Sequence, residues 1–167
     1  STAYNIPFGF IMNGDFEPGT FERAVQSVAQ RHESLRTVFI TVNGEPKQKI
    51  IDRFQWTLAQ TDVRDLDESE RENECARVYK QTAGHVFDLE HGPLFLFHAV
   101  RMEDRKWFLA YNFHHIVDDG WSHGIILSEI FSFYNGFQNH TEPALSLPGI
   151  QYKDYSAWHN RLVNGEA

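Results

Sequence analysis

Strand-like and helix-like segments alternate along this chain, and short polar turns join two pairs of the strand-like segments. Residues 37–42 and 47–51 flank Asn43-Gly44, which is a strong signal for a tight β-hairpin. Residues 94–102 and 106–113 flank a polar loop and form a second predicted hairpin. The pattern therefore predicts an α/β fold, a two-layer sandwich with a mixed, largely antiparallel sheet.

The remaining elements are assigned from apolar periodicity and turn residues. Strands are expected at 6–12 and 54–58, and helices at about 21–35, 62–82, 121–137 and 152–163. Acidic residues fill the first half of the 62–82 helix and are interpreted as a solvated helix surface. Cys75 lies in the second half of this helix and is interpreted as a small buried hydrophobic residue.

Composition limits the classes of function. The chain has 167 residues, which is enough for one compact domain. Its 15 Lys and Arg are outnumbered by 23 Asp and Glu, and this net charge of -8 disfavours nucleic acid as a partner. No apolar run approaches the roughly 20 residues needed to cross a bilayer, so no membrane partner is expected. A single cysteine cannot form an internal disulfide, which fits a cytoplasmic location.

The junction between the 106–113 strand and the following helix carries the residues best suited to chemistry. His114 and His115 end the strand, and Asp119 and Gly120 precede the helix. A neutral imidazole can accept a proton near neutral pH, and a glycine lets the backbone approach a ligand closely. Free N–H groups at a helix start can bind a developing negative charge. A metal site is not expected, because adjacent histidines on a strand point to opposite faces.

Four stretches of the chain resemble the condensation domains of nonribosomal peptide synthetases. His114-His115-x-x-x-Asp119-Gly120 resembles their HHxxxDG signature, and residues 31–39 (RHESLRTVF) resemble their RHExLRTxF motif. Residues 4–7 (YNIP) resemble the opening after their first motif, and residues 152–158 resemble YxDYAxW, with Ser156 in place of Ala. The stretches lie in the family's order, and the resemblance covers essentially the whole chain.

The resemblance implies a chloramphenicol acetyltransferase-like lobe and an acyltransferase activity. Residues 1–167 would form the N-terminal lobe, without the C-terminal lobe that completes the active-site tunnel, so the isolated lobe is expected to be inactive. The reaction forms an amide between a donor acyl or peptidyl thioester and an acceptor aminoacyl thioester. Expected partners are donor and acceptor carrier domains, the C-terminal lobe and an adenylation domain. No cofactor is expected to bind directly, because the carriers supply the phosphopantetheine.

The resemblance also suggests roles for individual residues. His115 would be the functional imidazole, and Gly120 would present its N–H to the thioester carbonyl. His114 would pack beneath the loop. Asp119 would form a buried structural pair with Arg31, or alternatively with Arg36.

The first residues of the following helix are substrate-binding candidates. Trp121 and Ser122 stand there, although Ser122 is also a candidate helix cap. The sequence Asp-Gly-Trp-Ser resembles the subtype that joins an L-donor to an L-acceptor. Two other interpretations remain open: a stand-alone CoA-dependent acyltransferase completed by trimerisation, and a non-catalytic module that docks carriers.

Overall fold

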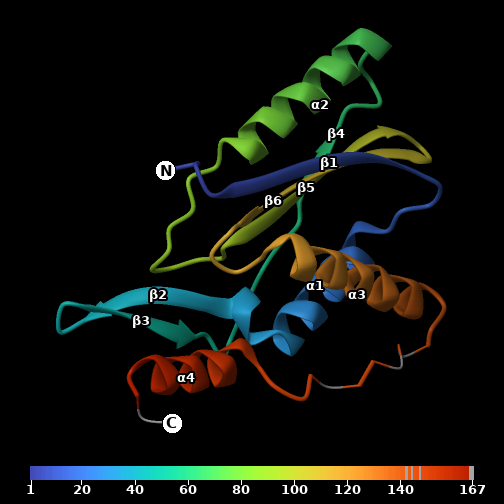
Figure 1. The fold of residues 1–167 in the computed structure, drawn as a ribbon. Coiled ribbons are helices and arrows are strands. Elements are labelled where there is room, and N and C mark those ends of the chain that lie inside the picture. The colour runs from blue at the N-terminus through green and yellow to red at the C-terminus, as the bar shows by residue number, and fades with distance from the viewer. Residues whose placement is uncertain (142, 144, 147, 166–167) are drawn as a thin grey trace.

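A four-stranded sheet lies at the centre of the computed structural model, which describes residues 1–141, 143, 145–146 and 148–165 (Figure 1). The strand order is β1-β6-β5-β4. These strands are β1 (Asn5–Asn13), β4 (Ala59–Asp62), β5 (Phe95–Glu103) and β6 (Lys106–His114). β6 pairs antiparallel with both β1 and β5, whereas β4 pairs parallel with β5. The predicted mixed, largely antiparallel sheet is confirmed, and so is the β5–β6 hairpin.

Helices cover both faces of this sheet, as Figure 1 shows. α1 (Pro18–Arg31) and α3 (Gly120–Gln138) pack on one face, against side chains that include Leu109, Tyr111 and Phe113 of β6. α2 (Glu68–Ala83) packs on the other face, where its Cys75 is buried as expected. The α/β class is therefore confirmed, but the predicted two layers are three. The reason is that β5 and β6 carry apolar residues on both faces, and each face needs its own cover.

The second hairpin stands apart from the central sheet. β2 (Thr37–Val42) and β3 (Glu45–Ile50) form a two-stranded sheet of their own, and Asn43 and Gly44 make the turn with φ of 54° and 81°. A short 3-10 helix, η1 (Glu33–Arg36), precedes it. α4 (Tyr152–Val163) buries no residue and lies beside this hairpin in Figure 1. None of the helices that the structure describes is long and apolar enough to cross a membrane.

The position of β4 differs from the prediction. No strand forms at 54–58, where Trp56 and Leu58 are buried in an irregular segment, and β4 begins at Ala59 instead. Asp67 then caps α2 through a reciprocal capping box, so this helix begins six residues later than expected. β4 is only four residues long and mostly exposed, so it carries no apolar pattern.

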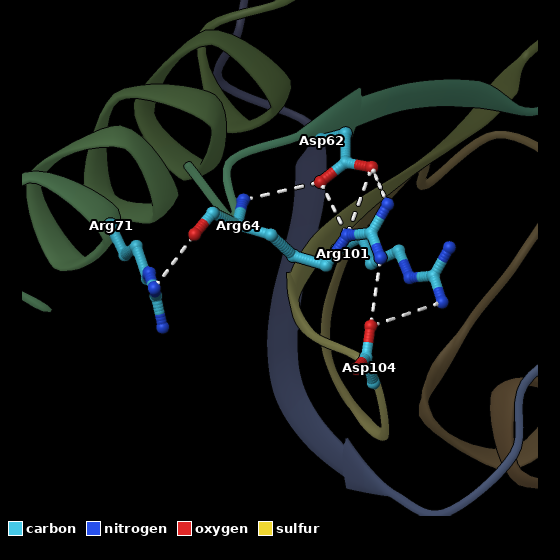
Figure 2. Close-up of polar contacts among 5 residues, drawn as sticks. All are labelled: Asp62, Arg64, Arg71, Arg101 and Asp104. Atoms are coloured by element: carbon cyan, nitrogen blue, oxygen red, sulfur yellow. Dashed lines mark hydrogen bonds and ion pairs between the residues drawn. The ribbon is translucent and has the colours of Figure 1, made fainter. Parts of the chain in front are cut away.

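A group of Asp and Arg side chains fixes the end of β4 next to the β5–β6 turn (Figure 2). Arg64 contacts Asp62 at 2.8 Å and Asp104 at 2.7 Å, and Arg101 lies 3.7 Å from Asp104. The hydrogen bonds from Arg64 lower the pKa of Asp62 to about 2. Arg71 extends the group by donating to the backbone carbonyl of Arg64 at 2.8 Å. This end of the sheet is opposite to the end at which His114 lies, because β6 runs from Lys106 to His114.

Candidate functional site

The loop between β6 and α3 brings two distant parts of the sequence together. The N–H of His115 donates to the carbonyl of Tyr4 at 2.8 Å, and Asn5 pairs with His114 in the β1–β6 ladder. The N–H of Val117 donates to the carbonyl of His114 at 3.0 Å, which closes a tight turn. Tyr4 and the first residue of β1 therefore hold the two histidines in place.

His114 is the inner histidine of the pair. Its side chain is buried, and its Nδ1 accepts a hydrogen bond from the N–H of Ile116 at 3.1 Å. This bond leaves the proton of the neutral ring on Nε2. The Phe87 and His114 rings pack at right angles to one another, with 6.0 Å between their centroids. Burial lowers the pKa of His114, with a smaller contribution from nearby positive charge, so the ring is held neutral beneath the loop.

His115 points the other way, toward solvent. Its side chain is exposed and lines a cavity of about 540 Å³ together with Tyr4, Phe87, Leu89, His114, Ile116 and Ser1. The cavity wall is thus mainly apolar. Its titratable groups are the two imidazoles, the Tyr4 hydroxyl and the N-terminal amine. An exposed imidazole in such a hollow can reach a bound substrate and exchange a proton with it.

Within the described ranges, one N–H in the first turn of α3 has no hydrogen-bond partner, and it lies next to this loop. Asp119 is the N-cap residue, and its carboxylate accepts from the N–H groups of Trp121 at 3.1 Å and Ser122 at 2.8 Å. The Ser122 hydroxyl accepts in return from the N–H of Asp119 at 2.9 Å. The N–H of Gly120 has no partner among the residues that the structure describes. It is therefore available to a ligand.

The predicted pair between Asp119 and an arginine is wrong. Arg31 instead contacts Glu129 of α3, with Nε 2.9 Å from Oε2, and it also donates to the carbonyl of Ser146. Arg36 donates to the carbonyl of Ile51 at 3.1 Å and lies 3.8 Å from Glu33. The reason is local: the N-cap position aims the Asp119 carboxylate at the helix N–H groups. Those hydrogen bonds, chiefly from Ser122, lower the pKa of Asp119.

The two substrate-binding candidates lie in different surroundings. Trp121 is 84% exposed, so its indole is free to meet a ligand or another protein surface. The Ser122 hydroxyl is engaged inside the loop, 2.8 Å from Asp119 Oδ1 and 2.9 Å from Asp118 Oδ1. Ser122 therefore serves as the hydrogen-bond partner of Asp119, the N-cap residue of α3.

The two other motif stretches meet one another at the C-terminal end of α1. Gln151, at the start of α4, accepts from the N–H of Glu33 at 3.1 Å and donates to the carbonyl of Arg31 at 3.0 Å. Lys153 forms an ion pair with Glu33 at 2.8 Å. Through the contact of Arg31 with Glu129 on α3, this region supports the same helix whose start carries Gly120.

Sequence reasoning missed three residues beneath the loop: Asp118, His123 and Tyr111. Asp118 is buried and lies 2.6 Å from Nδ1 of His123, and Nε2 of His123 lies 3.2 Å from the Tyr111 hydroxyl. A five-residue spacing across a helix start is not a known signal, so the sequence alone does not indicate this pairing. In the described part of the chain, no three His, Cys, Asp or Glu side chains are grouped so as to hold a metal ion.

Comparisons with known proteins agree on one family. A family model, described as the condensation domain, matches residues 1–167. A linear gramicidin synthase of Brevibacillus parabrevis is 37% identical over 163 residues, which cover 98% of this chain and 2% of that protein. Phosphinothricin tripeptide synthetase PhsB of Streptomyces viridochromogenes is 34% identical over 157 residues, 94% of this chain and 13% of that protein. The chain thus spans a small part of these curated relatives.

Solved structures show the same fold. The starter condensation domain of rhizomide synthetase RzmA superposes with a TM-score of 0.78 at 24% identity, covering 87% of this chain and 35% of that one. The X-domain from teicoplanin biosynthesis superposes with a TM-score of 0.85 at 23% identity, covering 98% of this chain and 34% of that one. These likenesses confirm the predicted α/β fold class, and the fold is shared with a condensation domain and an X-domain.

Proposed function

The chain belongs to the condensation-domain family, and we propose that it carries the His115 side of an amide-forming active site. The reaction is attack of an acceptor amine on a donor thioester. The new C–N bond forms as the C–S bond breaks, the carrier thiol leaves, and the amine gives up a proton. The observation that supports this proposal is the exposed imidazole of His115 in a cavity, on the loop that leads into a helix start whose Gly120 N–H has no partner in the described part of the chain.

In this proposal, His115 acts on the attacking amine of the acceptor. An α-amine with a pKa near 8 is mostly protonated at pH 7, so a proton must leave before or during attack. The exposed imidazole can take that proton as a general base, or it can orient the amine. General-base help contributes about 10²–10⁴-fold. His114 does not compete for this role, because it is buried and its Nδ1 is occupied by the N–H of Ile116.

In the same proposal, the Gly120 N–H stabilises the carbonyl oxygen of the donor thioester. The thioester oxygen gains negative charge as the amine attacks, and a fixed N–H at the positive end of a helix stabilises that charge. The other first-turn N–H groups, those of Trp121 and Ser122, are already bonded to Asp119. A Cβ added at Gly120 would meet nothing within 4 Å, so the space next to its Cα is open.

The finer assignments are part of the same proposal. Residues 1–167 act as the N-terminal lobe and require a C-terminal lobe, in keeping with a chain that covers about a third of its structural neighbours. The substrates arrive on phosphopantetheine arms of donor and acceptor carrier domains, next to an adenylation domain, in the cytoplasm. The Asp-Gly-Trp-Ser sequence supports joining of an L-donor to an L-acceptor.

The test uses the condensation domain of the polypeptide that carries this chain. Donor and acceptor carriers are loaded with aminoacyl groups, and the acceptor carrier is analysed by mass spectrometry. We expect the donor group to appear on the acceptor carrier through an amide. A second arm replaces the donor carrier with acetyl-CoA and measures the oligomeric state. Acetyl transfer by a trimer, without transfer between carriers, would contradict the proposal and favour a CoA-dependent acyltransferase.

A further inference from the structure

A buried polar group ties the start of α3 to the sheet, directly beneath the loop that carries His115. The Asp118 side chain has no exposed surface, and its Oδ2 lies 2.6 Å from Nδ1 of His123. Its other oxygen, Oδ1, accepts from the Ser122 hydroxyl at 2.9 Å. Both carboxylate oxygens of Asp118 are therefore used inside the protein.

Tyr111 of β6 completes the group. Burial, together with the charge of Asp118, raises the pKa of Tyr111 to about 12, so the phenol keeps its proton at neutral pH. Its hydroxyl lies 3.2 Å from Nε2 of His123 and can donate to it. Nδ1 of His123 faces the Asp118 carboxylate and Nε2 faces the Tyr111 hydroxyl, so both ring nitrogens have a polar partner inside the protein.

The His123 ring is also stacked on the sheet. Its centroid lies 4.9 Å from that of Phe8 and 5.6 Å from that of Tyr111, with interplanar angles of 29° and 21°. Phe8 belongs to β1 and Tyr111 to β6. His123 thus joins the first turn of α3 to the two strands that also position His115.

Helix capping does not account for Asp118, because Asp119 already caps α3. Stability is also a weak reason, since replacing both partners of a buried hydrogen bond with apolar groups of the same shape can be nearly neutral or stabilising. Catalysis by the group is excluded by its place: Asp118 and Tyr111 are buried and cannot touch substrate. What the group does fix is the path of the chain between His115 and Gly120.

We propose that Asp118 and His123 are positioning residues, which set the distance between the His115 imidazole and the Gly120 N–H. This inference rests on the proposed function. Asp118 lies three residues after His115 and two before Gly120, so a shift at Asp118 displaces both reacting groups. Misplacement of catalytic groups by about 1 Å can cost about 10²-fold in rate.

The experiment compares three variants of the complete condensation domain with the wild type. Asp118→Ala removes the hydrogen bond to His123, and we expect kcat to fall about 10²-fold with KM within about twofold. Asp118→Asn keeps an oxygen acceptor, and we expect it to recover most of the lost rate. Val78→Ala is the matched control, because it opens a cavity in the α2 cluster on the opposite face of the sheet. It lowers the melting temperature but leaves kcat unchanged.

Two results would overturn the proposal: a kcat for Asp118→Ala no lower than that of Val78→Ala, or no recovery in Asp118→Asn. If Asp118→Ala does not fold, Tyr111→Phe removes only the hydroxyl, and a kcat equal to the wild type then contradicts the role. Amide hydrogen exchange of residues 115–122 separates this inference from the proposed function. Exchange that is faster in Asp118→Ala than in Val78→Ala supports positioning even if the wild type shows no turnover, and equal exchange refutes it.

Discussion

Substitution of Asp119 distinguishes a helix cap from a buried ion pair. The Asp119 carboxylate accepts two hydrogen bonds, from the N–H groups of Trp121 and Ser122, and its own N–H is bonded to the Ser122 hydroxyl. Loss of an N-cap side chain costs about 1 kcal/mol, with a range of about 0.5–2 kcal/mol, whereas Asn caps about as well as Asp. We therefore expect Asp119→Ala to destabilise by about 1 kcal/mol and Asp119→Asn to be nearly neutral.

Thermal unfolding at pH 7 measures the difference. For a domain of this size, 1 kcal/mol shifts the melting temperature by about 2–4 °C. Asp119→Ala should therefore melt about 2–4 °C below the wild type, and Asp119→Asn within about 1–2 °C of it. A buried pair broken at one partner would cost about 3–5 kcal/mol, or more than about 6 °C.

A double-mutant cycle supplies the control. Arg31 contacts Glu129 and not Asp119, so the effects of Arg31→Ala and Asp119→Ala should add within about 0.5 kcal/mol. A melting temperature for Asp119→Asn more than 6 °C below the wild type would refute the capping assignment. So would a coupling energy of 1 kcal/mol or more between the two positions.

Three further predictions follow from the packing and the charges. Glu129→Ala leaves Arg31 in a largely buried place without its carboxylate, and should lower the free energy of unfolding in urea by about 3 kcal/mol; no change would contradict the pair. Gly9→Ala places a Cβ 2.8 Å from the Phe108 ring and should cost about 1–3 kcal/mol in the same assay, while a neutral result would show that the ring can move. The lowered pKa of His114 means that the unfolded chain binds a proton which the folded chain resists. Stability should therefore fall as the pH drops below about 6.5, and His114→Gln should flatten this dependence in melts at pH 5.5 and 7.5; an unchanged slope would contradict it.

Local patterns in the sequence predict most of the fold. The Asn43-Gly44 turn specifies the β2–β3 hairpin, and apolar periodicity locates α1 and α3. β4 escapes prediction because its four residues are mostly exposed and owe their place to pairing with β5 and to contacts such as that of Arg64 with Asp104. Local patterns do not predict the number of layers either, because tertiary packing decides which face of the sheet each helix covers.

The candidate site is predicted only in part. Alternation along a strand indicates that His114 and His115 point to opposite sides, and the structure places one inside and the other outside. The partner of Asp119 is mispredicted, although an Asp directly before a predicted helix start is itself a capping signal. The Asp118–His123 contact is invisible in the sequence, because it depends on how α3 meets the sheet.

The most direct test of the account is the single-turnover rate of amide formation by the complete condensation domain with His115→Ala. Because the His115 side chain is exposed, the variant should melt within about 1 °C of the wild type. We predict a rate about 10²-fold or more below the wild type on identical loaded carriers. A variant that forms the amide at the wild-type rate would contradict the assignment of His115 to the reaction.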